Sequence, residues 1–149
     1  MESAPSDRRN EGGKGSVALT GATGFIGGAI AKRLADSGWS VKALVRDLAK
    51  ANSLARLGVE LVHGDLEDTA ALRSLLLGVQ AVVHCAGVVR GIDLEDFSRI
   101  NVAGAERLAS LAATMDPPPL FVALSSLAAR EPQLSHYAAS KREGEVALE

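Results

Sequence analysis

Ser16-Val-Ala-Leu-Thr-Gly-Ala-Thr-Gly-Phe-Ile-Gly-Gly28 is the stretch that decides the fold of this chain. A short apolar run feeds a glycine-rich turn, and the turn opens a helical pattern that begins at Phe25. Gly21 allows a tight turn after the strand, Gly24 lets a phosphate group approach the backbone, and Gly27 lets the helix pack close to the strand. Backbone N–H groups at the helix start, with the positive end of its dipole, face such phosphates. The order of strand, turn and helix predicts a dinucleotide-binding unit.

The same turn supplies the first candidate cofactor residues. The residues expected to surround the pyrophosphate are Thr20, Gly21, Thr23, Gly24, Phe25, Ile26 and Gly27. The alternative is a plain glycine turn that binds nothing. We favour the cofactor site, because the strand before the turn and the helix after it are both present.

Strand-like apolar runs alternate with helical patterns along the rest of the chain. The expected strands cover residues 16–20, 40–45, 60–63, 81–85 and 120–124, and the expected helices cover residues 25–37, 48–57, 69–77, 94–114 and 136–148. Asp68, Asp93 and Ser135 are expected to be helix N-caps. The alternation predicts a Rossmann-type doubly wound parallel sheet in three α/β/α layers. We assign this domain to residues 15–149 and expect residues 1–14, which are polar and aperiodic, to form a disordered leader.

Composition excludes several classes of function. The 149 residues carry a net charge of −2, so no basic surface points to nucleic acid or to an anionic membrane. The apolar runs are too short to span a bilayer, and no secretory signal opens the chain. Cys85 is the only cysteine, which excludes an internal disulfide and is typical of a reducing, cytoplasmic location.

Ligands on such a sheet bind beyond the carboxyl ends of the strands, so each strand end is a candidate site. Arg46 follows the second strand, where a guanidinium suits a cofactor 2′-phosphate, and Lys50 lies one helical turn further on. The alternative is a solvated pair of Arg46 with Asp47. Asp65-Leu66 follows the third strand, where adenine would lie, and its alternative is an ordinary turn with a helix-capping aspartate.

The fourth strand ends in small residues, and the fifth ends in hydroxyls. Cys85, Ala86 and Gly87 are expected beside the cofactor, whereas for His84 and Cys85 themselves packing is the favoured role and we expect no metal site. Ser125-Ser126 at the end of the fifth strand offers a hydroxyl to a substrate oxygen.

Tyr137 and Lys141 stand four residues apart, so on a helix both project from one face. A free tyrosine has a pKa near ~10, and a nearby ammonium favours the phenolate. The tyrosine hydroxyl could then take a proton from an alcohol or give one to a carbonyl. The alternative is an aromatic residue and a lysine on a surface helix. The Ser-Ser strand end and the earlier glycine turn favour the catalytic interpretation.

Together these motifs resemble the extended short-chain dehydrogenase/reductase superfamily, of the NAD(P)-dependent epimerase/dehydratase type. The matching pieces are the T-G-x-x-G-F-I-G turn from Thr20 to Gly27, the Asp65-Leu66 pair, the Asn101-Val-Ala-Gly104 stretch, and the set Ser126, Tyr137 and Lys141. The resemblance implies that Tyr137 is the acid/base and that Lys141 lowers its pKa and holds the nicotinamide ribose. Ser126 would orient the substrate oxygen, with Ser125 as the alternative. For Asn101 we slightly favour packing against the fifth strand over a catalytic role.

The resemblance also implies the chemistry and its partners. Hydride would pass between nicotinamide and a carbonyl or hydroxyl substrate, such as a sugar nucleotide or a small ketone or alcohol. Arg46 resembles the NADP-preferring branch, so we expect NADP rather than NAD. Relatives dimerise through helices that correspond here to residues 94–114 and 136–148. A non-catalytic cofactor sensor of the same fold is the alternative function.

Length is where the chain departs from the family. Extended members are roughly twice as long and carry a C-terminal substrate-binding region, so we expect this chain to be a C-terminally truncated part of a longer protein. We expect the isolated 149 residues to bind cofactor with little or no turnover.

Overall fold

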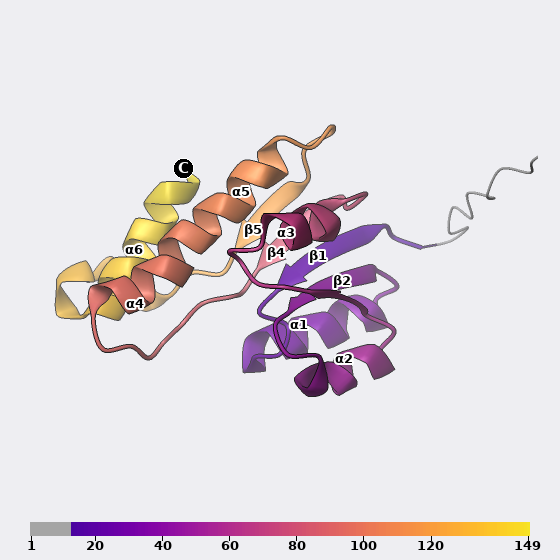
Figure 1. Ribbon diagram of the computed structural model, residues 1–149, viewed down its shortest axis with the longest axis horizontal. Coiled ribbons are helices and arrows are strands. Elements are labelled where there is room, and N and C mark those ends of the chain that lie inside the picture. Colours follow the sequence, from indigo (N-terminus) through magenta and orange to yellow (C-terminus); the bar gives the residue numbers. More distant parts are fainter. Residues whose placement is uncertain (1–12) are drawn as a thin grey trace, which may run out of the picture.

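The computed structural model describes residues 13–149, and residues 1–12, most of the predicted leader, lie outside the described residues. A five-stranded, fully parallel sheet has the order β3-β2-β1-β4-β5 (Figure 1). Its strands are β1 (Ser16–Thr20), β2 (Ser40–Val45), β3 (Glu60–His63), β4 (Ala81–His84) and β5 (Leu120–Ala123). The order reverses at β1, between β2 and β4, which creates the crevice where ligands of doubly wound sheets bind. The predicted Rossmann-type fold is therefore confirmed.

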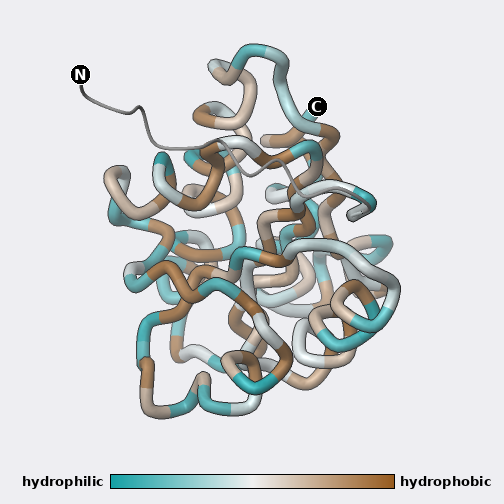
Figure 2. The backbone as a smooth tube through the Cα atoms, turned by 90° about the vertical axis from the view of Figure 1, so that its right-hand side faces the viewer, coloured by the Kyte–Doolittle hydropathy of each residue, from teal (hydrophilic) through white to brown (hydrophobic). Residues whose placement is uncertain are grey.

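Helices cover both faces of the sheet (Figure 1). They are α1 (Phe25–Asp36), α2 (Asn52–Arg56), α3 (Thr69–Leu76), α4 (Leu94–Ser98), α5 (Ala105–Ala113) and α6 (His136–Leu148). Side chains of successive strand residues enter opposite cores. Leu19 packs with α1 and α2, whereas Ala18 packs with α3 and α5. Hydrophobic and hydrophilic stretches accordingly alternate along the backbone (Figure 2).

Side-chain caps start several of these elements, as the sequence predicts. Asp68 accepts a hydrogen bond from Ala71 N–H, and Asp93 accepts one from Asp96 N–H, at 3.0 Å in both cases. Ser135 caps α6 through Ala138 N–H. Each cap satisfies a backbone donor that would otherwise have no partner in the first helical turn.

Two predicted helices differ in detail. The helix expected at 48–57 is a 3₁₀ turn, η1 (Leu48–Ala51), followed by the short α2. The helix expected at 94–114 is α4, then a π-helical segment, η2 (Arg99–Gly104), then α5. Two further 3₁₀ turns, η3 (Leu127–Arg130) and η4 (Pro132–Leu134), connect β5 to α6. The π-helical segment contains Asn101, whose side chain is held by hydrogen bonds outside the helix.

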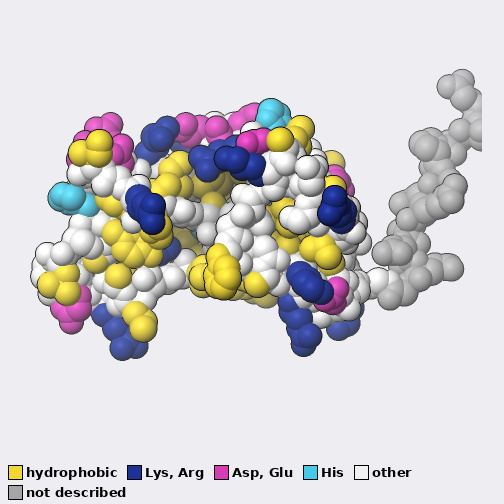
Figure 3. Space-filling model, turned by 90° about the horizontal axis from the view of Figure 1, so that it is seen from below, with side chains coloured by type: hydrophobic (Ala, Val, Ile, Leu, Met, Phe, Trp, Pro, Cys, Tyr) yellow, Lys and Arg dark blue, Asp and Glu magenta, His cyan; other side chains and the backbone are white. Residues whose placement is uncertain are grey.

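One edge of the sheet is open within the described residues. β5 pairs only with β4 there, and Leu120 and Val122 on the strand and Leu124 directly after it are exposed. Seen from below, Lys and Arg side chains are dispersed among Asp and Glu, without a single basic patch on that face (Figure 3). No helix within residues 13–149 is long and apolar enough to cross a membrane.

Candidate cofactor and active site

The glycine turn has the backbone geometry that close approach of a ligand requires. Gly21 has a φ of 72°, and a Cβ there would meet the backbone N of Ala86 at 2.6 Å. A Cβ at Gly27 would collide with the carbonyl oxygen of Gly21. The turn therefore packs directly against the end of β4 and the first turn of α1, and side chains at either position would separate them.

The start of α1 lacks the side-chain cap that starts α3, α4 and α6. Its N-cap is Gly24, with no side-chain hydrogen bond and no acidic residue in the first turn. The N–H groups of this turn are thus left for a ligand, and the helix dipole favours an anionic one. A cradle closed to Cβ atoms, with free donors at its helix, fits the pyrophosphate of a dinucleotide.

A cavity of about 280 Å³ lies at this turn. Ten of the predicted cofactor residues line it: Thr20, Gly21, Thr23, Gly24, Arg46, Asp65, Leu66, Cys85, Ala86 and Gly87. The other predicted cofactor residues do not line it: Phe25, Ile26, Gly27, Tyr137 and Lys141. Phe25 is 97% exposed, and Gly27 is buried against the turn. The structure therefore brings together residues from four strand ends that are distant in the sequence.

The carboxylate next to Arg46 is engaged by other partners. Asp47 accepts a hydrogen bond from Ala49 N–H at 3.0 Å and lies 3.7 Å from the Lys50 ammonium. Within the described part of the chain Arg46 forms no ion pair, so the solvated Arg46–Asp47 pair is not what the structure contains. Arg46 lines the cavity together with Asp65 and Glu67, and it forms an ion pair with neither of them.

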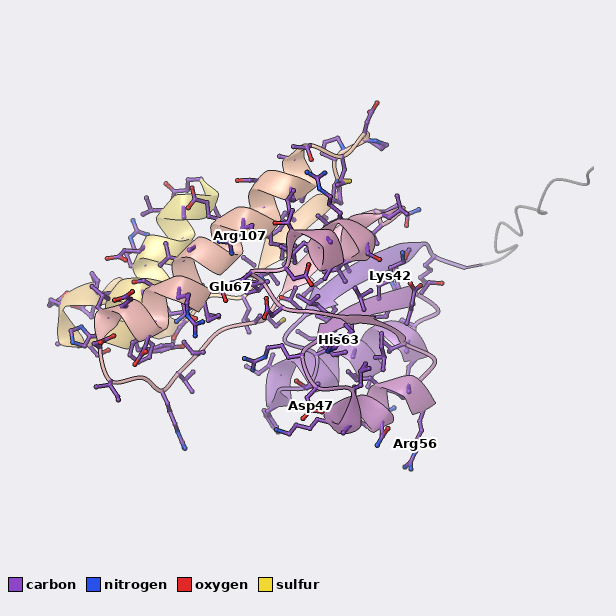
Figure 4. All side chains as sticks on the ribbon, in the orientation of Figure 1. Lys42, Asp47, Arg56, His63, Glu67 and Arg107 are labelled. Carbon is purple, nitrogen blue, oxygen red and sulfur yellow. The ribbon has the colours of Figure 1, made fainter. Side chains whose placement is uncertain are left out.

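Asp65 both lines the cavity and holds its own turn. Its Oδ1 accepts hydrogen bonds from Glu67 N–H at 2.8 Å and from Asp68 N–H at 3.1 Å. Arg107 of α5 donates to the Leu66 carbonyl at 2.7 Å, which fixes this loop against the helix layer (Figure 4). Asp65 therefore forms the expected turn and also lines the cavity where we expect the cofactor.

Of the predicted catalytic residues, Ser126 directly precedes η3, and Tyr137 and Lys141 lie on α6. Tyr137 is half-buried, with its ring 6.2 Å from that of Phe97 in α4. Lys141 Nζ donates to the Leu124 carbonyl at 2.9 Å. Ser126 Oγ accepts from Ala128 N–H at 3.2 Å and so caps η3. No hydrogen bond joins these three side chains to one another in the described structure.

Ser125, the alternative hydroxyl, is engaged elsewhere. It donates to the Glu145 carboxylate, which also forms an ion pair with Arg142 at 3.0 Å. These two partners lower the pKa of Glu145, the hydrogen bond from Ser125 being the larger cause. Ser125 and Lys141 line a common small cavity, and Ser125 and Ser126 together line a wider groove beside η3.

Burial sets the electrostatics around Lys141. Removal from water lowers the pKa of the Lys141 ammonium, and the charges of Glu145 and Cys85 partly offset this. Burial raises the pKa of the Cys85 thiol, against the influence of Lys141. Burial, and secondarily Lys141, lowers the pKa of His84 to about 4. Within residues 13–149, no cluster of His, Cys, Asp and Glu is arranged to hold a metal ion.

Asn101 is a central connection rather than a residue packed on β5. Its side chain donates to the Val88 carbonyl at 3.0 Å, accepts from Val88 N–H at 2.8 Å, and donates to Ser140 Oγ at 2.9 Å. Ser140 in turn donates to the Tyr137 carbonyl at 2.8 Å. The cofactor loop and the Tyr137 helix are thus linked through one buried amide.

The sequence pattern of the family described as "NAD dependent epimerase/dehydratase family" matches residues 17–149, which is most of the chain. The chain belongs to this family.

Known proteins similar to this family member include enzymes of the same superfamily. Ceramide reductase of Caulobacter vibrioides is 44% identical over 135 residues, which cover 91% of this chain and 42% of that protein. A short-chain dehydrogenase/reductase superfamily protein from Agrobacterium tumefaciens, solved with bound NAD, has a TM-score of 0.74 and 25% identity, with 89% of this chain and 44% of that one covered. A short-chain dehydrogenase from Sphingobium yanoikuyae, solved with NADPH, has a TM-score of 0.75 and 26% identity, with 87% and 60% covered.

The chain thus spans less than half the length of the ceramide reductase it matches. The family consists of NAD(P)-dependent epimerases, dehydratases and reductases. The similar solved structures include both an NAD-bound and an NADPH-bound protein.

Six residues that line the cavity were not predicted: Leu44, Gly64, Glu67, Val88, Arg99 and Ile100. Gly64, Glu67 and Val88 directly adjoin predicted residues, so extending each strand end by one or two positions would have found them. Arg99 lies 3.5 Å from Glu67, and both residues line the cavity. Nothing in the local sequence singles out Arg99 or Ile100, because the π-helical segment decides which way they face.

Proposed function

We propose that this chain is the cofactor-binding and catalytic part of an NADP(H)-dependent reductase that acts on a carbonyl or hydroxyl group. The observation that carries the proposal is that the cavity and the predicted catalytic segment lie at the same end of the sheet, where the strands have their carboxyl ends. The cavity with its uncapped helix start, and the segment that bears Ser126, Tyr137 and Lys141, both follow carboxyl ends of adjacent strands.

The residues divide the work as follows. Gly21, Gly24 and the start of α1 hold the pyrophosphate, and Arg46 binds the 2′-phosphate through charge-assisted hydrogen bonds. Bound NADP(H) supplies the hydride. Tyr137 gives a proton to the substrate oxygen or takes one from it, and Lys141 stabilises the phenolate form.

For this activity we favour a long-chain, apolar substrate. Ceramide reductase is 44% identical to this chain, and its name specifies ceramide. The segments that follow β1, β4 and β5 carry exposed apolar side chains at the edge where substrate would enter. Phe25 is 97% exposed, Ile92 94% and Leu127 78%. Such side chains suit a hydrocarbon chain better than a sugar nucleotide.

The experiment compares variants in a protein that turns over. NADPH consumption with a long-chain oxo-amide would be followed for the intact protein and its Tyr137→Phe and Lys141→Ala variants. Tyr137→Phe keeps the ring's packing on Phe97, so NADPH affinity should hold while turnover falls roughly 10²–10⁴-fold. Lys141→Ala should weaken NADPH affinity and also lower turnover. Unimpaired turnover in Tyr137→Phe would remove this residue from the chemistry, whereas NADPH binding without any turnover in the wild type would favour a non-catalytic cofactor sensor.

A further inference from the structure

His84 is a buried titratable residue that the proposed chemistry does not use. It ends β4 and stands beside Thr20 in the register of the sheet. Its side chain is 5% exposed, and its ring lies 6.3 Å from that of Phe121. The imidazole therefore sits between the first residue of the glycine turn and the helix layer that carries Lys141.

The edge of this imidazole that carries Nδ1 is held by Thr20. The Thr20 hydroxyl lies 2.7 Å from His84 Nδ1, is fully buried, and already accepts a hydrogen bond from Ala86 N–H at 3.2 Å. The hydroxyl proton needs an acceptor, and Nδ1 is the acceptor in reach. Nδ1 therefore accepts, which places the single proton of a neutral ring on Nε2.

The opposite edge of the ring, which carries Nε2, borders a cavity that Lys141 also lines. His84 lines a cavity of about 60 Å³ together with Asn101, Ser125, Lys141 and Glu145. Nε2 has no hydrogen-bond partner among residues 13–149. Every fully enclosed side-chain nitrogen or oxygen in that range does have a partner, so Nε2 is not fully enclosed. Nε2–H is therefore accessible from the cavity, which is large enough for a water molecule.

We propose that His84 is a positioning residue that joins the phosphate-binding turn to the surroundings of Lys141. Thr20 fixes the ring on one side, and the ring presents an N–H donor to the lysine cavity on the other. This inference rests on the proposed function, in which Thr20 opens the pyrophosphate turn and Lys141 serves Tyr137. A shift of the turn on cofactor binding would then reach Lys141 through a rigid ring rather than through flexible side chains.

The charge of the ring matters to this role. A protonated His84 would place a second cation beside Lys141, and a ring with its proton on Nδ1 would offer the ammonium an acceptor. The neutral ring with Nε2–H does neither. Besides Lys141, the charged or titratable groups near the ring are Cys85, next along the chain, and Glu145 across the cavity.

Two variants test the contacts of Nδ1 and Nε2 separately. His84→Asn keeps an acceptor at the Nδ1 position and removes the N–H that enters the cavity. Thr20→Val removes the donor and keeps the shape. We expect His84→Asn to retain NADPH affinity within about twofold, and to raise the pKa of Lys141 because an N–H donor in the cavity that Lys141 also lines is lost. We expect Thr20→Val to weaken NADPH binding about three- to tenfold, the worth of one hydrogen bond. Thr114→Val, at an exposed hydroxyl, is the matched control.

Nuclear magnetic resonance of the full chain supplies readouts that a merely structural role would not move. Nitrogen-15 spectra should show His84 neutral, with its proton on Nε2, from pH 5 to 8, and NADP⁺ should shift its Nδ1 signal. Carbon-13 dimethylation reports the pKa of Lys141, assigned with Lys141→Arg. A His84 that titrates in this range, carries its proton on Nδ1, or leaves Lys141 unchanged in His84→Asn would overturn the proposal. Absence of any NADPH or NADH binding would instead refute the proposed function. Should Thr20→Val not fold, the wild-type spectra still decide.

Discussion

Asn101 and Ser140, 39 residues apart, are joined by a buried hydrogen bond of 2.9 Å from Nδ2 to Oγ. Asn101 lies on the π-helical segment and Ser140 on the helix of Tyr137, and Gly144 brings the two elements close enough that a Cβ there would collide with the Asn101 carbonyl. Irregular π segments often mark functional sites, and this one aims an amide at two partners.

Removing this amide should destabilise the chain strongly. Asn101→Ala deletes three hydrogen bonds and leaves Val88 and Ser140 groups without partners, at a cost of about 2–4 kcal/mol in the free energy of unfolding. Ser140→Ala should cost about 1 kcal/mol, and Ser110→Ala, at an exposed position of α5, should cost nothing measurable. Urea denaturation measures all three. Equal stability of Asn101→Ala and Ser110→Ala would contradict the connection.

Arg46 should decide between the two cofactors. Its guanidinium lines the cavity without an ion-pair partner in the described region, so Arg46→Ala should weaken NADPH binding about ten- to a hundredfold and leave NADH binding unchanged. Arg56→Ala is the matched control, because Arg56 points away from the cavity at the end of α2 (Figure 4). Loss of both cofactors together in Arg46→Ala would assign Arg46 a structural role instead.

Acid should destabilise the fold through His84. Burial lowers its folded-state pKa from 6.5 to about 4, so the unfolded chain binds more protons between these values. The stabilisation is present above pH 6.5 and is lost as pH falls toward 4, by about 2 kcal/mol between pH 7 and pH 5. Urea denaturation at both pH values should show this loss in the wild type and in His63→Asn, and a smaller one in His84→Asn. A difference of the same size in all three would exclude His84 as its source.

The open strand edge should promote self-association. Val122 is 48% exposed on β5, which within residues 13–149 pairs only with β4. An unpaired edge with apolar neighbours recruits a second chain. Sedimentation should show dimers or larger species for the wild type, and Val122→Lys should shift them toward monomer. Val146→Lys, on exposed α6, tests the expected helix-mediated dimer instead. A wild type that stays monomeric at high concentration would contradict both modes.

The sequence predicts the strands, their parallel arrangement and most of the cavity, because these depend on local patterns. Apolar runs, glycines at turns and aspartate caps act within a few residues of one another. The π-helical segment was not predictable, because Asn101 is diverted by Val88 and Ser140, which are distant in the sequence. The exposure of Phe25 and the engagement of Ser125 by Glu145 also depend on how elements pack. The roles assigned to Ser126, Tyr137 and Lys141 stay predictions.

Calorimetric titration of the 149-residue chain with NADPH and with NADH tests the central claim most directly. The proposed site predicts that both cofactors bind and that NADPH binds about ten- to a hundredfold more tightly, through the Arg46 contact with the 2′-phosphate. Tighter binding of NADH, or no binding of either, would contradict it.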